Sequence, residues 1–151
     1  MNPIKAFAVA MFLLASLAGA GKVAAQDRSA RATVPFDFNV GNRWVPAGTY
    51  TLSSDMTNPK LVFIRSQDGK TSLLSVTQAE DSKSDTNKLV FVKYGDQYFL
   101  HEIQCPGCGM TVAFPNSKHE RIARTRLEAG LASPSELYLA LSTNAAGLKR
   151  K

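Results

Sequence analysis

The chain has 151 residues, of which 44% are hydrophobic and 20% charged, and its formal net charge is +6. A chain of this length predicts one domain, which can bury a hydrophobic core without several disulfides. Its basic residues do not form the dense patches, interleaved with aromatic residues, that nucleic-acid-binding proteins carry, so we expect no nucleic-acid partner.

Residues 1–25 have the pattern of a cleavable signal peptide. A positive start at Lys5 precedes residues 6–20, which carry no charge. This run is shorter than the roughly 20 apolar residues that a membrane span needs, although an uncleaved anchor is the alternative. Small residues at 23–25 predict cleavage after Ala25, which removes Lys5 and Lys22 and no acid and lowers the net charge to +4. We expect an exported protein (periplasmic, outer-membrane-associated or extracellular) with no transmembrane segment after cleavage.

The next segments indicate a strand-rich domain. Residues 26–32 are small and polar and are predicted to be a disordered lead-in. Apolar residues then alternate from Thr33 to Val40, as in a strand with one buried face. A turn at Gly41-Asn42 follows, and Pro46 interrupts the next extended segment because it has no N–H to donate. Further strands are predicted at 43–45, 49–52, 61–65, 71–77, 89–94 and 97–103.

Two hairpins are predicted from their turns. Asp68-Gly69, at the centre of a two-residue loop, favours a type I′ turn and places Phe63 opposite Leu74 and Leu61 opposite Val76. After an exposed loop at 78–88, a second hairpin turns at Gly95-Asp96, with glycine first as in a type II′ turn.

The second hairpin carries large apolar groups on both faces. Phe91 is expected opposite Leu100 on one face, and Val92 opposite Phe99 on the other. We therefore predict a central hairpin that is covered on both sides.

Helix is predicted only near the C-terminus. Ser117 and Glu120 fit a capping box that opens a helix to about Ala129, and Gly130 is a natural stop. A second short helix is predicted from Ser133 to Leu141, before a basic tail. The predicted fold is mainly β, a single antiparallel β-sandwich or small barrel with one or two short C-terminal helices. Its parts are the signal peptide 1–25, lead-in 26–32, β-rich domain 33–130, and short helix and tail 131–151.

Several of these motifs carry a resemblance. They are residues 34–41 (VPFDFNVG), residues 46–50 (PAGTY), residues 94–100 (YGDQYFL) and the segment from Ser117 to Arg124. Together they resemble a family of small secreted proteins of soil acidobacteria. The resemblance covers about Thr33 to Arg124 and implies export and a shared fold. Because these are turn and core motifs, it supplies no active-site residues, and the segment 105–108 departs from it.

Cys105 and Cys108 form a C-x-x-C motif, the one motif in the sequence whose spacing suggests a specific chemistry. In an oxidising compartment the plain expectation is a local disulfide that closes a loop. Metal binding and redox catalysis are the alternatives. A redox C-x-x-C motif needs a helix start after the pair, and residues 109–112 do not indicate one. A zinc site needs further ligands, and His101 and His119 are more typical of structural or solvated histidines.

Other candidate residues point to binding rather than catalysis. Trp44 and Tyr50 could stack on a sugar ring, and Arg121 and Arg124 could present a basic helix face to an anionic polymer or lipid headgroups. A core position and a solvated face are the alternatives. The single acids Asp37, Asp96 and Glu102 define no catalytic pair.

The sequence therefore favours an exported, non-enzymatic structural or binding module at the cell envelope or outside the cell, with no cofactor. The possible partners are a cell-envelope polymer or protein. The alternatives are a thiol–disulfide protein that uses Cys105 and Cys108, and a module that binds carbohydrate or an anionic polymer.

Overall fold

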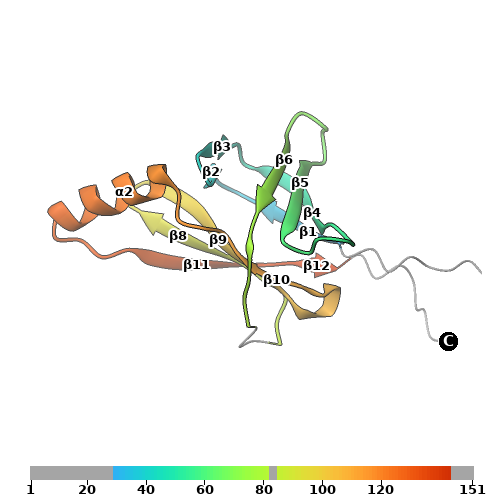
Figure 1. Ribbon diagram of the computed structural model, residues 1–151. Helices are drawn as coiled ribbons and strands as arrows, with labels where there is room; N and C mark the ends of the chain where they lie inside the picture. Colours follow the sequence, from blue (N-terminus) through green and yellow to red (C-terminus); the bar gives the residue numbers. More distant parts are fainter. Residues whose placement is uncertain (1–28, 82–84, 144–151) are drawn as a thin grey trace, which may run out of the picture.

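A computed structural model describes residues 29–81 and 85–143, which form two sheets and one α-helix (Figure 1). The first sheet has the order β12 (Ser142–Thr143), β1 (Ser29–Val34), β4 (Gly48–Ser54), β5 (Leu61–Ser66) and β6 (Ser72–Val76). The second has the order β11 (Ser135–Ala140), β8 (Lys88–Tyr94), β9 (Gln97–Cys105), β10 (Met110–Ala113) and β7 (Gln78–Ala79). The mainly-β prediction is confirmed.

Two short strands join the second sheet at its side. β2 (Phe38–Val40) pairs with β3 (Arg43–Val45), and Asn39 of β2 lies beside Phe99 of β9 in parallel. The helix α2 (Lys118–Ala129) lies at the end of the molecule away from β5 and β6 (Figure 1). No helix in the described ranges is long and apolar enough to cross a bilayer.

The main core lies between the two sheets. Phe91 of β8 is fully buried, and its ring meets Phe36 and Phe38 edge to face. A second, smaller cluster packs Val92 and Phe99 against α2. The β8–β9 hairpin is therefore covered on both faces, as its sequence predicts.

The predicted register of both hairpins is confirmed. Phe63 pairs with Leu74 and Leu61 with Val76, while Phe91 pairs with Leu100 and Val92 with Phe99. Gly95 has a φ of 62°, which a type II′ turn requires at its first position.

The turn type of the first hairpin differs from the prediction. Only Gly69 has a positive φ there (73°), whereas a type I′ turn needs positive φ at Asp68 as well. Ser66 N–H donates to Thr71 O, which closes a four-residue loop, and Gly69 N–H donates to Ser66 O. The register survives because both loops are centred on the same two residues.

The folded domain is longer than predicted at its N-terminal side. Residues 29–32 are not a disordered lead-in, because they form most of β1 and bury Ala30 and Ala32. The strand predicted from Thr33 to Val40 is interrupted after Val34, where the chain passes from the first sheet to the second. The predicted loop at 78–88 contains β7, which pairs with β10.

The prediction of a second C-terminal helix is wrong. Residues 135–140 form β11, which pairs along β8 with six residue pairs. Leu137, Leu139 and Leu141 have a spacing of two, and Leu141 is buried, so the strand pattern prevails over the Ser-Pro helix-start signal. The predicted signal peptide, residues 26–28 and the tail after Thr143 lie outside the described residues.

A β-bulge interrupts β9. Val90 of β8 faces Glu102, and the next residue, Phe91, faces Leu100, so His101 is the extra residue. Leu100 and Ile103 consequently face the same core although they are three residues apart. The bulge turns His101 away from that core, a re-aiming that β-bulges often produce.

Candidate functional site: a hollow beside an exposed tryptophan

A hollow of about 490 Å³ lies between the β2–β3 hairpin, the β8–β9 turn and α2. The hairpin contributes Asp37, Asn39 and Trp44, the turn contributes Asp96, and the helix contributes His119 and Arg126. These residues come from three distant parts of the sequence. The hollow therefore exists only in the folded domain.

Trp44 is the most prominent side chain at this hollow. It pairs with Asn39 across the hairpin, and 63% of its surface is exposed although it is a large aromatic residue. An exposed indole offers a flat apolar face together with one N–H donor. Trp44 therefore contributes no large share of the core and is free to contact a ligand.

Hydrogen bonds hold the walls of the hollow in place. Asn39 Nδ2 donates to the carbonyl of Tyr98 at 3.2 Å, which ties the hairpin to β9. Asp37 Oδ1 accepts the N–H of Ala47 at 2.8 Å, and Asn42 Oδ1 accepts the N–H of His119 at 3.2 Å. The last bond joins the hairpin to the start of α2, so the site is largely preformed.

The polar groups of the hollow include both donors and acceptors. Asp37 and Asp96 supply carboxylate oxygens, while Arg126 and His119 supply N–H groups. All four residues are exposed. Such a set suits a ligand with many hydroxyl groups, because each hydroxyl both donates and accepts.

Tyr50 does not share this surface. It is 2% exposed, and its hydroxyl donates to the carbonyl of Pro46 at 2.5 Å. Burial, with a contribution from the negative charge of Asp68, raises the pKa of Tyr50. Tyr50 lies beside a different hollow of about 440 Å³, so the proposed pairing of Trp44 and Tyr50 as a sugar platform is wrong. Tyr50 instead takes the core position that the sequence left open as the alternative, because its side of β4 faces the core.

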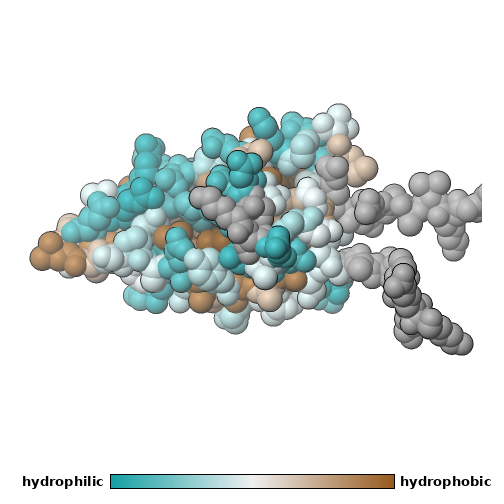
Figure 2. Space-filling view, turned by 90° about the horizontal axis from the view of Figure 1, so that it is seen from below, coloured by the Kyte–Doolittle hydropathy of each residue, from teal (hydrophilic) through white to brown (hydrophobic). Residues whose placement is uncertain are grey.

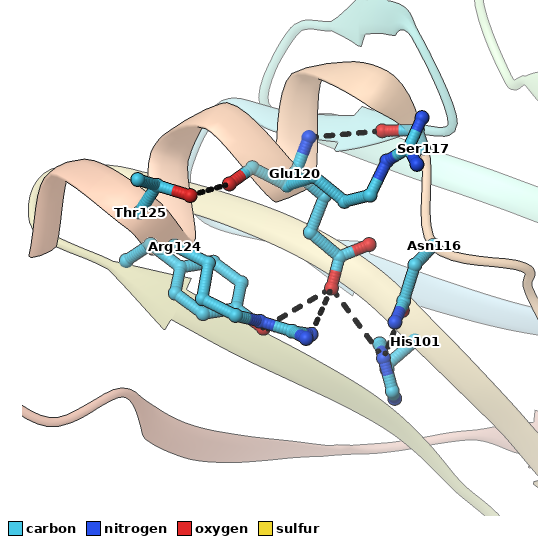
Figure 3. Close-up of polar contacts among 8 residues, drawn as sticks. His101, Asn116, Ser117, Glu120, Arg124 and Thr125 are labelled. Atoms are coloured by element: carbon cyan, nitrogen blue, oxygen red, sulfur yellow. Dashed lines mark hydrogen bonds and ion pairs between the residues drawn. The ribbon is translucent and has the colours of Figure 1, made fainter. Parts of the chain in front are cut away.

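A buried polar cluster anchors α2 to the second sheet (Figure 3). Glu120 is 4% exposed, and its Oε1 lies 3.2 Å from the Tyr94 hydroxyl, which donates to it. The same oxygen lies 3.5 Å from His101 Nε2 and 3.7 Å from Arg124 Nη2. Arg124 also donates to the Tyr94 hydroxyl, at 3.0 Å from Nη2. One carboxylate thus joins the helix to both strands of the central hairpin.

The cluster shifts the titration of its members. Burial opposes ionisation of Glu120, but the hydrogen bond and charge of His101, with help from Tyr94 and Arg124, outweigh it and lower the pKa of Glu120. The hydrogen bond to Glu120 raises the pKa of His101 against the effect of burial. Burial is the main reason that the pKa of Tyr94 is raised. We therefore assign the cluster an ionic character near neutral and mildly acidic pH.

The two candidate arginines of α2 have different environments. Arg124 is turned toward Tyr94 and Glu120, with its guanidinium 5.6 Å from the Tyr94 ring centre. Arg121 is exposed on the outer side of the helix. Of the two arginines predicted to form a basic helix face, Arg121 therefore lies on that face and Arg124 does not.

Cys105 and Cys108 form a disulfide, with their Cα atoms 5.4 Å apart. It closes the turn between β9 and β10, in which Cys105 pairs with Met110 across the hairpin. The residues after Cys105 form a short 3-10 turn, η2 (Pro106–Cys108), and a strand follows it. The helix N-terminus that activates redox C-x-x-C pairs is absent from this described segment.

The sequence does not reveal the Glu120 cluster or the hollow. Ser117 caps the helix as predicted, since its Oγ accepts the N–H of Glu120 at 3.1 Å. The Glu120 side chain, however, is buried against the sheet. A signal was present in β9, where the spacing from Leu100 to Ile103 breaks the period of two and marks His101 as a bulge. Within 29–81 and 85–143, no three His, Cys, Asp or Glu side chains are grouped to hold a metal ion.

Comparison of the chain with protein-family models, with curated proteins and with solved structures finds no match. The geometry of the site is therefore the basis on which a function can be assigned.

Proposed function

We propose that the protein is an exported binding module that holds a short stretch of carbohydrate in the hollow beside Trp44. The observation that carries the proposal is a tryptophan 63% exposed on the rim of a hollow whose walls present carboxylates, an arginine and a histidine. The C–H face of a sugar ring packs well on an indole, and its hydroxyls need the donors and acceptors around it. The proposal does not include turnover of the ligand.

The size and rigidity of the site support this assignment. A volume of about 490 Å³ falls within the range of about 300–1,000 Å³ that is common for small-molecule sites. The bonds from Asn39 to Tyr98 and from Asn42 to His119 fix the walls before binding. A preformed site avoids part of the entropy cost of ordering loops around a ligand.

Export is part of the same proposal. The signal-peptide pattern at 1–25 supports it, and the Cys105–Cys108 disulfide is compatible with an oxidising compartment. Envelope and extracellular polysaccharides are the carbohydrates that an exported module would meet.

Trp44 makes the test direct because it is the single tryptophan of the chain. The protein without residues 1–25 is titrated with neutral, acidic and amino oligosaccharides while Trp44 fluorescence is recorded, and hits are confirmed by calorimetry. We expect a blue shift on binding. Trp44→Ala should weaken binding about tenfold, which corresponds to 1.4 kcal/mol.

Trp44→Phe should retain part of the affinity, because it keeps an aromatic face. Tyr138→Ala is the matched control, since Tyr138 is 53% exposed and lies on β11, outside the hollow. The proposal is wrong if no saccharide changes the fluorescence at millimolar concentration, or if Trp44→Ala binds as tightly as the unmodified protein.

A further inference from the structure

The C-terminal end of α2 presents a leucine that the fold does not need. Leu131 is 96% exposed and has a φ of 58°, the left-handed region that favours glycine. Its N–H donates to Glu128 O, and Ala132 N–H donates to Leu127 O, so Leu131 occupies the left-handed position of a Schellman motif. Gly130, which could take that position, has a φ of −85°. Neither backbone conformation nor core packing accounts for a leucine here.

The outer side of α2 is basic and partly apolar. A shallow depression along it is lined by Lys118, Arg121, Ile122, Thr125 and Arg126, which include three cations and no acid. Ile122 is 40% exposed on this side. Figure 2 shows an apolar surface at the end of the molecule where α2 terminates in Figure 1. A depression with three cations thus lies along the helix that ends at the apolar tip, and one exposed acid, Glu128, lies in the last turn between them.

We propose that this face docks on an anionic phospholipid bilayer, with Leu131 in the boundary between headgroups and acyl chains. Lys118 and Arg121 would contact lipid phosphates, as basic residues of interfacial helices do. An anionic lipid surface complements both features, because it attracts the cations and removes Leu131 from water. A soluble polyanion complements the cations alone.

This docking is separate from carbohydrate binding. The hollow opens beside the depression and shares Ile122 and Arg126 with it, whereas Lys118, Arg121 and Leu131 do not line the hollow. Variants at these three positions therefore test docking and leave the side chains around Trp44 unchanged.

The experiment measures co-sedimentation of the protein without residues 1–25 with vesicles of phosphatidylcholine alone or mixed with phosphatidylglycerol. We expect binding only to the anionic vesicles, and weaker binding as salt rises. The double variant Lys118→Gln, Arg121→Gln should bind roughly thirtyfold more weakly, from about 1 kcal/mol for each basic residue removed. Leu131→Gly should bind roughly three- to tenfold more weakly.

Leu131→Gly is the decisive variant because glycine suits a positive φ. Its folded state should be at least as stable as that of the unmodified protein, so lost binding cannot result from unfolding. Leu74→Ala is the matched control, since Leu74 is 58% exposed on β6 and its removal should leave binding unchanged.

Three outcomes would overturn the proposal. They are no binding to anionic vesicles, equal binding to both kinds of vesicle, and unchanged binding of Leu131→Gly. Binding to immobilised polygalacturonate that depends on Lys118 and Arg121 but not on Leu131 would assign the face to an anionic polymer instead. Saccharide binding is measured through Trp44 and vesicle binding by co-sedimentation. Each proposal can therefore fail without deciding the other.

Discussion

Replacing Glu120 by glutamine tests whether the buried carboxylate fastens α2 to the sheet. The amide keeps the shape of the side chain and one acceptor oxygen but removes the charge that faces His101, Tyr94 and Arg124. Removing one partner of a fully buried ion pair costs about 3–5 kcal/mol, and a hydrogen bond to a charged group contributes about 1.5–3 kcal/mol. The side chains of His101 and Arg124 are 30% and 37% exposed, so water can solvate them when the carboxylate is lost. We expect a loss of about 2–3 kcal/mol at pH 5.5.

The pH dependence of this loss follows from the two shifted groups. The raised pKa of His101 contributes stability below its ordinary value of 6.5, and that contribution is lost as pH rises through the folded pKa. The lowered pKa of Glu120 contributes stability above its ordinary value of 4.5, and that contribution is lost as pH falls through the folded pKa. The cluster therefore stabilises the fold most between about pH 4.5 and 6.5. Glu120→Gln should cost less stability at alkaline pH than at pH 5.5, because a His101 that loses its proton no longer pairs its charge with the carboxylate.

Urea unfolding at pH 5.5 and 8.5, followed by circular dichroism, measures these differences. Glu128→Gln is the matched control, because Glu128 is exposed on the same helix and should change stability by less than about 0.5 kcal/mol. NMR titration adds a second readout, in which the pKa of His101 should fall in Glu120→Gln. An equal loss at both pH values, together with an unchanged His101 pKa, would refute the reasoning.

Two further substitutions test the turn and the helix end. Replacing both Cys105 and Cys108 by alanine should lower the free energy of unfolding by about 2 kcal/mol, the entropy expected for so short a closed loop, and urea unfolding with and without reductant checks it. If the double variant is as stable as the unmodified protein with its disulfide intact, the disulfide does not stabilise the fold. Leu131→Gly should raise the unfolding free energy by about 1 kcal/mol, because it relieves a left-handed leucine, and a lower thermal midpoint would contradict this.

The hairpins could be predicted from the sequence because their information is local. The turn residues at Gly69 and Gly95 set which residues face each other, and the apolar pattern sets which face is buried. The pairings Phe63 with Leu74 and Phe91 with Leu100 follow from these two signals alone.

The ends of the domain could not be predicted in the same way. β1 is rich in small and polar residues, and it is ordered through pairing with β4 and β12. β11 begins with a helix-start signal, and pairing along β8 decides its conformation. Local propensity is a weak guide where partners distant in sequence supply the stabilisation.

The candidate site could not be predicted from local sequence signals either. Trp44 could be singled out as an aromatic residue, but its exposure depends on how β2 and β3 lie against β9 and α2. Tyr50 shows the same limit, since a tyrosine in a strand can face either side of the sheet. The partners of Glu120 follow from the bulge at His101, which the strand register establishes.

The pairing of the first strand with the last has a consequence for how the chain matures. Ala30 of β1 lies opposite Thr143 of β12, and β8 pairs with β11 along the side away from β9. A chain that emerges from its N-terminus onward therefore leaves one edge of β1 and one edge of β8 unpaired until residues 135–143 appear. Unpaired edges are templates for aggregation, so a chain truncated before Ser135 should collect in aggregates or bind chaperones. The last nine described residues are thus required to complete the pairing of both sheets.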